Sequence, residues 1–117
     1  MGRSVETRIE RRDGGPVCDR CRVADRPFAR MRGLLGRRSL PNGEGVLLRP
    51  TSSIHTFFMR FPIDVVFLDQ ELCVMTVVPE LAPWRMASRR GARAVLELAA
   101  GECERRSLRP GDRVVVA

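Results

Sequence analysis

The stretch from Ile54 to Asp69 restricts the possible folds of this chain more than any other. It contains the only histidine, His55, and four of the five phenylalanines. Every second residue from Phe57 to Phe67 is apolar. Because successive side chains of a β-strand point to opposite faces, this alternation predicts extended structure with one face packed on the core and the other mixed.

Pro62 divides this stretch into two parts. Proline cannot donate a hydrogen bond within a sheet, so it favours an edge, a bulge or a break. We therefore expect two extended segments, Ser53–Arg60 and Ile63–Leu68, with a bend between them. Arg60 and Asp64 fall on the same face, and a bend at Pro62 could bring them together. A charge among apolar neighbours is costly unless it is paired, so we interpret these two residues as a salt bridge, with a ligand-binding pair as the alternative.

Further strands are predicted from short apolar or alternating segments. They are Val5–Arg11, Val17–Val23, Val46–Leu48, Cys73–Val78, Ala94–Leu98 and Arg113–Val116. The dipeptide Asp13-Gly14 favours a hairpin between the first two, and we expect the first strand to lie at a sheet edge. The segment from Pro79 to Ser88 holds two prolines and the only tryptophan, Trp84, which predicts an irregular loop.

Two helical segments complete the prediction. Apolar residues at helical spacing predict the main helix over Asp25–Leu35, and a short helical turn follows at Glu102–Ser107. About seven short strands with these two helical pieces indicate an α+β fold that is predominantly β. We expect a small barrel-like or folded sheet, antiparallel or mixed, in a single domain covering residues 1–117.

The charge balance of the chain is strongly basic, with a net charge of +7. The sequence contains no lysine, so every basic side chain is arginine, which points first to a genome that favours arginine codons. The arginines are scattered, and the 5% aromatic content is low for a platform on which bases stack. Nucleic-acid binding is therefore a lesser hypothesis than solvated surface charge.

Neither a membrane span nor a secretory signal is found in the sequence. No run approaches the ~18 apolar residues that cross a bilayer, and the charged N-terminus lacks an apolar segment. We expect a cytoplasmic protein without membrane association, provided that the chain is the full gene product.

Four cysteines, Cys18, Cys21, Cys73 and Cys103, are expected to be thiols in a reducing cytosol. Cys18 and Cys21 have the spacing of half a zinc site, but no second half follows. On a strand, residues three apart face opposite sides, so both thiols could bind one ion only at a turn. We therefore predict neither a metal site nor a cofactor.

Several motifs together resemble a known family. They are R-G-L-L-G-R at Arg32–Arg37, V-L-L at Val46–Leu48, H-T-F-F-M-R-F-P-I-D at His55–Asp64, A-V-L-E-L-A-A-G at Ala94–Gly101 and G-D-x-V at Gly111–Val114. Their order and spacing are similar to the bacterial and archaeal family catalogued as domain of unknown function 192. The resemblance covers Val17–Val116 and leaves residues 1–16, the N-terminal edge hairpin, outside. It implies a compact barrel-like fold with a helix and no established activity.

This chain departs from the family pattern at two places. Leu35 stands where methionine is common, and Arg60-Phe61 stands where Lys-Asn is common. The second departure removes an amide side chain from the motif, so a family role that depends on such an amide does not transfer to this chain.

We predict a small soluble binding or accessory module, with a site lined by His55, Phe58, Arg60, Asp64 and Trp84. Its ligand would be a small polar or anionic molecule or a peptide, and its natural partner is unknown. The alternative is an enzyme in which His55 is a general base and Arg60 binds an anion beside Asp64 and Glu97. The sequence favours the module, because it has no nucleophile motif, phosphate-binding glycine loop or cluster of metal ligands.

Overall fold

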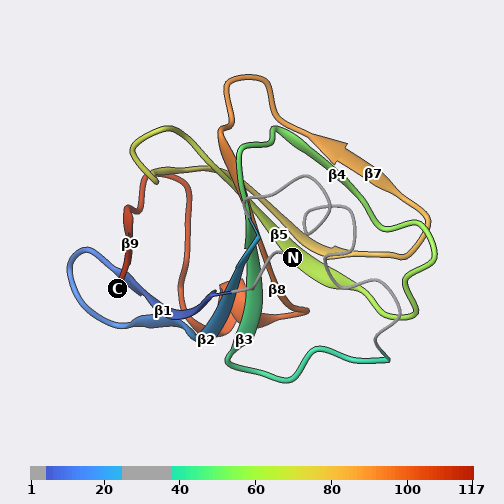
Figure 1. Cartoon of the computed structure of the whole chain (residues 1–117), viewed down its shortest axis with the longest axis horizontal. Coiled ribbons are helices and arrows are strands. Elements are labelled where there is room, and N and C mark those ends of the chain that lie inside the picture. The colour runs from blue at the N-terminus through green and yellow to red at the C-terminus, as the bar shows by residue number, and fades with distance from the viewer. Residues whose placement is uncertain (1–4, 25–37) are drawn as a thin grey trace.

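The computed structural model describes residues 5–24 and 38–117 (Figure 1). The predicted main helix, Asp25–Leu35, lies outside the described residues. The strands are β1 (Val5–Arg11), β2 (Pro16–Ala24), β3 (Glu44–Leu48), β4 (Ser53–His55), β5 (Ile63–Leu68), β6 (Val74–Leu81), β7 (Met86–Ser88), β8 (Ala94–Ala99) and β9 (Val114–Val116). The helix α2 (Glu102–Arg105) confirms the predicted short helical turn.

Seven of these strands form one mixed sheet in the order β6-β5-β8-β3-β2-β1-β9. Every neighbouring pair is antiparallel except β2 and β3, which are parallel. A parallel pair needs a crossover connection, and the segment predicted as the main helix belongs to that connection. The predominantly β fold is confirmed, with β1 and β2 paired as the predicted hairpin. The prediction that β1 is an edge strand was wrong, because β9 pairs with its outer side.

The sheet curls until its two edges approach each other without closing into a barrel. Its edge strands are β6 and β9, and a single isolated bridge joins Cys73, just before β6, to Arg113, just before β9. Nearby, the Val74 N–H donates to the Asp112 carbonyl over 2.8 Å, and the Val114 N–H donates to the Leu72 carbonyl over 3.0 Å. Of the two predicted forms, a barrel-like sheet and a folded sheet, the structure has the folded sheet.

Both faces of the sheet are buried at its centre. All six residues of β5 and all six of β8 are buried. One apolar cluster contains Val66, Leu68 and Leu96, and the cluster on the other face contains Ile63, Val65 and Phe67. The expectation that only one face of this stretch packs on the core was wrong. A central strand covered on both faces is apolar at nearly every position rather than at every second one.

A second, two-stranded sheet of β4 and β7 lies across the molecule from β9 in Figure 1. The predicted strand Ser53–Arg60 ends at His55, because the Met59 N–H donates to the Thr56 carbonyl and closes a turn at Phe57-Phe58. The predicted irregular segment from Pro79 to Ser88 instead supplies the end of β6 and the whole of β7.

Gly45 in β3 lies close against the neighbouring strands, and it provides a test of the packing. A Cβ atom there would lie 2.7 Å from the Glu97 carbonyl oxygen and 3.1 Å from the Cys18 sulfur. We expect Gly45→Ala to lower the free energy of unfolding by about 1–3 kcal/mol, because a backbone oxygen in the neighbouring strand cannot move aside. Urea denaturation measures the change, with substitution of the exposed Arg8 in β1, Arg8→Ala, as the control. A variant as stable as that control would contradict this packing.

Candidate functional site

An exposed aromatic cluster forms where β4 ends and β7 begins. Its side chains, here called the aromatic platform, are His55, Phe57, Phe58, Trp84 and Met86. The His55 and Phe57 ring centroids are 4.7 Å apart, those of Phe57 and Trp84 are 5.9 Å apart, and those of Phe58 and Trp84 are 4.6 Å apart. Met86 is the cross-strand partner of His55. Phe58, Trp84 and Met86 are 66%, 54% and 71% exposed, which is unusual for large apolar side chains that lie in one cluster.

Thr56 fixes the backbone beneath the platform. It is fully buried, and its N–H donates to the Arg85 carbonyl over 2.8 Å while its carbonyl accepts the Trp84 N–H over 2.9 Å. Its hydroxyl donates to the Ala82 carbonyl over 2.7 Å and accepts the Arg85 N–H over 2.9 Å. One side chain and its own peptide groups therefore join the two loops that carry the aromatic rings.

Two of the platform residues have backbone conformations that side chains rarely adopt. Phe58 has φ 66° and Trp84 has φ 64°. Left-handed backbone at a residue other than glycine costs of order 1–3 kcal/mol and persists only where surrounding contacts enforce it. The hydrogen bonds of Thr56 supply that enforcement. The molecule thus stabilises a strained backbone that presents bulky apolar rings to solvent.

The flanks of the platform carry positive charge. Arg60 follows the turn at Phe57-Phe58, Arg85 follows Trp84, and both side chains are exposed. The Arg85 guanidinium donates weakly to the Trp84 carbonyl over 3.4 Å. Neither arginine forms an ion pair within the part of the chain that the structure describes, so both are available to an acidic ligand.

The structure brings together three of the predicted site residues, His55, Phe58 and Trp84. Arg60 lies on the same loop, whereas Asp64 lies in the interior of the main sheet. Sequence reasoning did not select Phe57 and Met86 for the platform or identify the anchoring role of Thr56. The alternating pattern assigned Phe57 to the core, and nothing local in the sequence reveals that residues 56 and 82–85 are in contact.

Asp64 has a structural role that differs from the predicted salt bridge. Its Oδ1 accepts the N–H of Glu80 over 2.9 Å and of Gly101 over 3.1 Å, and its Oδ2 accepts the N–H of Cys103 over 2.9 Å. The carboxylate is fully buried, and Arg60 is exposed. No ion pair among the described residues joins Asp64 to Arg60, so that prediction was wrong. Backbone amides, not a guanidinium, satisfy the buried charge.

Glu97 is a second buried carboxyl group, on the opposite face of the sheet from Asp64. In the ladder between β5 and β8, Asp64 pairs with Leu98 and Glu97 pairs with Val65, so the two side chains project to opposite faces. Burial raises the pKa of Glu97 from 4.5 to about 7, and nearby Arg22 opposes part of this shift. With His55 exposed on the separate sheet, these groups do not converge on one reaction centre.

A β-bulge alters the expected geometry of Cys18 and Cys21. Ile9 pairs with Cys18 and Thr7 pairs with Cys21, so β2 has one residue more than β1 between these pairs. Both cysteines therefore point into the same core cluster, and the prediction that they face opposite sides was wrong. A hydrogen bond between the thiols lowers the pKa of Cys18 and raises that of Cys21, and burial also raises the pKa of Cys21.

The described residues contain neither a cluster of metal ligands nor a membrane-spanning helix. Within residues 5–24 and 38–117, no three side chains of His, Cys, Asp or Glu gather as a group that could hold a metal ion. No helix in the same residues has the length and apolar character needed to cross a bilayer.

The sequence profile of one protein family matches nearly the whole chain. The sequence profile of domain of unknown function 192, described as "Uncharacterized ACR", matches residues 8–116. The chain belongs to this family. The match begins within β1, nine residues before the stretch from Val17 on which the resemblance was first based.

One relative agrees with this assignment, and two solved structures share the fold. A protein of Thermococcus sibiricus named UPF0127 protein is 32% identical over 91% of this chain and 71% of its own length. The crystal structure of a putative transcription regulator from Sinorhizobium meliloti has a TM-score of 0.87, with 22% identity over 99% of this chain and 97% of that one. A protein of unknown function from Novosphingobium aromaticivorans has a TM-score of 0.78, with 23% identity over 96% and 84%. At these identities the two structures show the shared fold alone.

Removal of the Asp64 carboxylate tests its structural role. We expect Asp64→Ala to lower the free energy of unfolding by about 3 kcal/mol or more, because the buried Cys103 N–H and the part-buried N–H groups of Glu80 and Gly101 lose their acceptor. Chemical denaturation measures this loss, with the exposed Asp13→Ala as the control. A loss below about 0.5 kcal/mol would show that water or other groups replace the carboxylate without cost.

The raised pKa of Glu97 predicts a dependence of stability on pH. Between pH 4.5 and about 7 the native Glu97 is protonated, whereas the unfolded residue has released its proton, so rising pH favours unfolding. Ionisation of this group should remove roughly 3 kcal/mol of stability across that window. Denaturation of the wild type and Glu97→Gln at several pH values measures the difference, with exposed Glu104→Gln as the control. Parallel pH profiles for all three proteins would contradict the burial of an ionisable Glu97.

Proposed function

We propose that this chain is a single-domain binding module that docks an acidic, partly apolar peptide segment of a partner protein on the aromatic platform. The observation that carries the proposal is the joint exposure of Phe58, Trp84 and Met86 on a backbone that Thr56 holds in a strained conformation. Aromatic and methionine side chains of this kind are enriched at the centres of protein interfaces. A rigid platform loses little conformational entropy when a partner binds.

Charge supports an acidic partner. Arg60 and Arg85 flank the platform without an ion pair in the described part of the chain, and the whole chain carries a net charge of +7. Guanidinium groups bind carboxylates through paired hydrogen bonds, which specify orientation as well as sign. An acidic segment with interspersed apolar residues would satisfy both the arginines and the rings.

The arrangement of the rings favours a peptide over single-stranded nucleic acid. The His55 and Phe57 rings are inclined by 29° to each other, and those of Phe57 and Trp84 by 26°, so these rings stack on one another. Rings that already stack have fewer free faces for nucleobases. The protein from Sinorhizobium meliloti with the same fold is described as a putative transcription regulator, so DNA is the competing ligand that an experiment should include.

The enzyme alternative has less support. It required His55, Arg60, Asp64 and Glu97 to act together. Asp64 is occupied by three backbone N–H groups, and Glu97 projects from the other face of the sheet. His55 stacks on Phe57, and its Nδ1 accepts the Phe57 N–H over 3.3 Å. Each group therefore has a separate local role.

The only tryptophan of the chain lies in the platform and provides a direct reporter. Titration with short peptides that alternate acidic and apolar residues should shift the Trp84 fluorescence saturably to shorter wavelength, as the ring leaves water. Peptides with lysine in place of the acidic residues should bind much more weakly. We expect Phe58→Gly to weaken binding about tenfold or more, the loss typical of an interface hot spot. Glycine also relieves the backbone strain at that position, so this variant should remain folded.

Ser107→Gly is the matched control, because Ser107 is another exposed residue with positive φ, at 55°, next to α2. It relieves similar strain without removing a ring, and it should bind like the wild type. A fluorescence response to a single-stranded oligonucleotide or to anionic vesicles, with none to the peptides, would overturn the proposal. Equal weakening in Ser107→Gly would also overturn it.

A further inference from the structure

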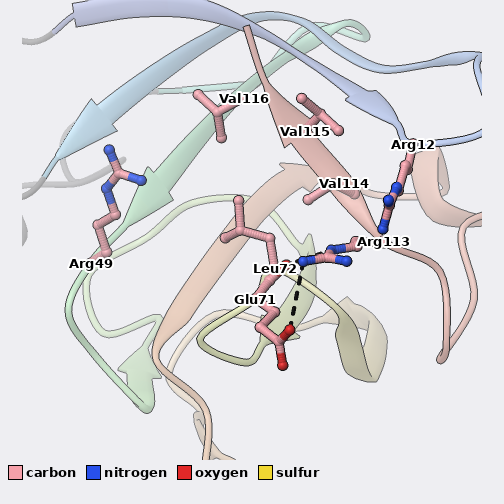
Figure 2. A pocket seen from close by; sticks show the side chains of 8 residues that line it. All are labelled: Arg12, Arg49, Glu71, Leu72, Arg113, Val114, Val115 and Val116. Atoms are coloured by element: carbon pink, nitrogen blue, oxygen red, sulfur yellow. Dashed lines mark hydrogen bonds and ion pairs between the residues drawn. The ribbon is translucent and has the colours of Figure 1, made fainter.

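An arginine-lined pocket lies beside β9 (Figure 2), and no residue of the aromatic platform lines it. Its volume is about 580 Å³, within the range of small-molecule sites. The lining residues are Arg12, Arg49, Glu71, Leu72, Arg113, Val114, Val115 and Val116. They come from the β1–β2 turn, the segment after β3, the β5–β6 turn and β9, so four separate parts of the chain build the pocket.

We propose that this pocket binds a small organic anion, a carboxylate or a phosphate ester carried on a short apolar body. The first reason is charge. Arg113 pairs with Glu71 over 3.7 Å and donates from Nε to the Glu71 carbonyl over 3.0 Å. Arg12 and Arg49 have no side-chain hydrogen bond or ion pair in the described part of the chain. Figure 2 shows them on opposite sides of the pocket, so the lining carries a guanidinium on each side.

The two neighbouring carboxylates, Asp13 and Asp112, form no ion pair with Arg12 or Arg113 among the described residues. Asp13 and Asp112 line an adjacent hollow of about 370 Å³ that shares Arg12 and Arg113. Asp13 pairs with Arg11 over 3.5 Å, and Asp112 accepts the backbone N–H of Arg109 over 2.8 Å. Both acidic groups are therefore engaged elsewhere.

The free edge of β9 adds a backbone donor. The Arg12 N–H donates to the Arg113 carbonyl over 2.7 Å, and the Ala117 N–H donates to the Arg8 carbonyl over 2.9 Å. The peptide groups of Arg113 and Ala117, which flank β9, therefore face β1. Because hydrogen bonding alternates along an antiparallel ladder, the N–H groups of Val114 and Val116 point away from β1, toward the pocket. The Val114 N–H is bound to Leu72. The Val116 N–H has no partner among the described residues and can donate to an anion.

The apolar part of the lining selects an organic ligand over a bare ion. Val114 is buried, and Leu72 and Val116 are half-buried, so the base of the pocket offers aliphatic surface next to the arginines. Removing a short alkyl chain from water contributes about 0.8 kcal/mol for each buried methylene group. An alkyl carboxylate or alkyl phosphate would use both features at once.

NMR titration with hexyl phosphate and with hexanoate tests the proposal. We expect the amide signals of Val114 to Val116 and the methyl signals of Leu72 to shift saturably. Arg12→Gln and Arg49→Gln should each weaken binding about tenfold, the contribution of one charge-assisted contact. Both variants should keep the wild-type melting temperature, because neither side chain forms a hydrogen bond or an ion pair with a described residue. A response to only one of the two ligands identifies which anionic group the pocket accepts.

Arg90→Gln is the matched control, because it removes the same charge from an exposed loop between β7 and β8. It should leave the affinity unchanged. Equal weakening by Arg90→Gln, or shifts spread over all arginine-bearing surfaces, would reduce the effect to general charge attraction and overturn the proposal. Binding of inorganic phosphate as tight as that of hexyl phosphate would overturn the role of the apolar base. Failure of both ligands to bind would end the proposal and leave the peptide platform unaffected.

Discussion

The carboxylate of Asp64 is the interaction on which the arrangement of the main sheet depends. It lies within β5 and binds backbone N–H groups of Glu80 in β6, Gly101 before α2 and Cys103 in α2. A buried charge is tolerable only when hydrogen bonds replace its water shell, and three donors do so here. The same bonds fix where β6 and α2 lie relative to the centre of the sheet. The sequence of one strand thus determines the position of two later segments.

Thr56 positions the backbone of the aromatic platform through hydrogen bonds, as Asp64 does for the main sheet. Both residues are fully buried, and both use side-chain oxygen atoms to hold backbone that is distant in sequence. The difference lies in what they stabilise. Asp64 holds segments that bury their apolar surface, whereas Thr56 holds loops that expose it. Local strain at Phe58 and Trp84 is therefore supported by the fold while both rings stay in solvent.

The fold was more predictable from the sequence than the candidate site. Short-range signals such as Asp13-Gly14 and the apolar run Ile63–Leu68 specified the hairpin and the central strand, because neighbouring residues alone determine them. The partners of Asp64 were not predictable in the same way, since its acceptor atoms bind residues 16 to 39 positions away along the chain. The bulge that turns Cys18 and Cys21 to one side likewise depends on the partner strand. Contacts of this kind can be predicted only when the register of all strands in the sheet is known.

The near-contact of the two sheet edges has a consequence for how the molecule behaves in a crowded solution. An exposed edge strand offers unpaired peptide groups to other chains and is a common starting point for aggregation. Here the bridge between Cys73 and Arg113 pairs the residues just before β6 with those just before β9, so each shields the other's backbone. Farther along β6, Pro79 has no N–H to offer to another chain. A curled sheet can therefore resist growth by addition of neighbouring molecules without the full closure of a barrel.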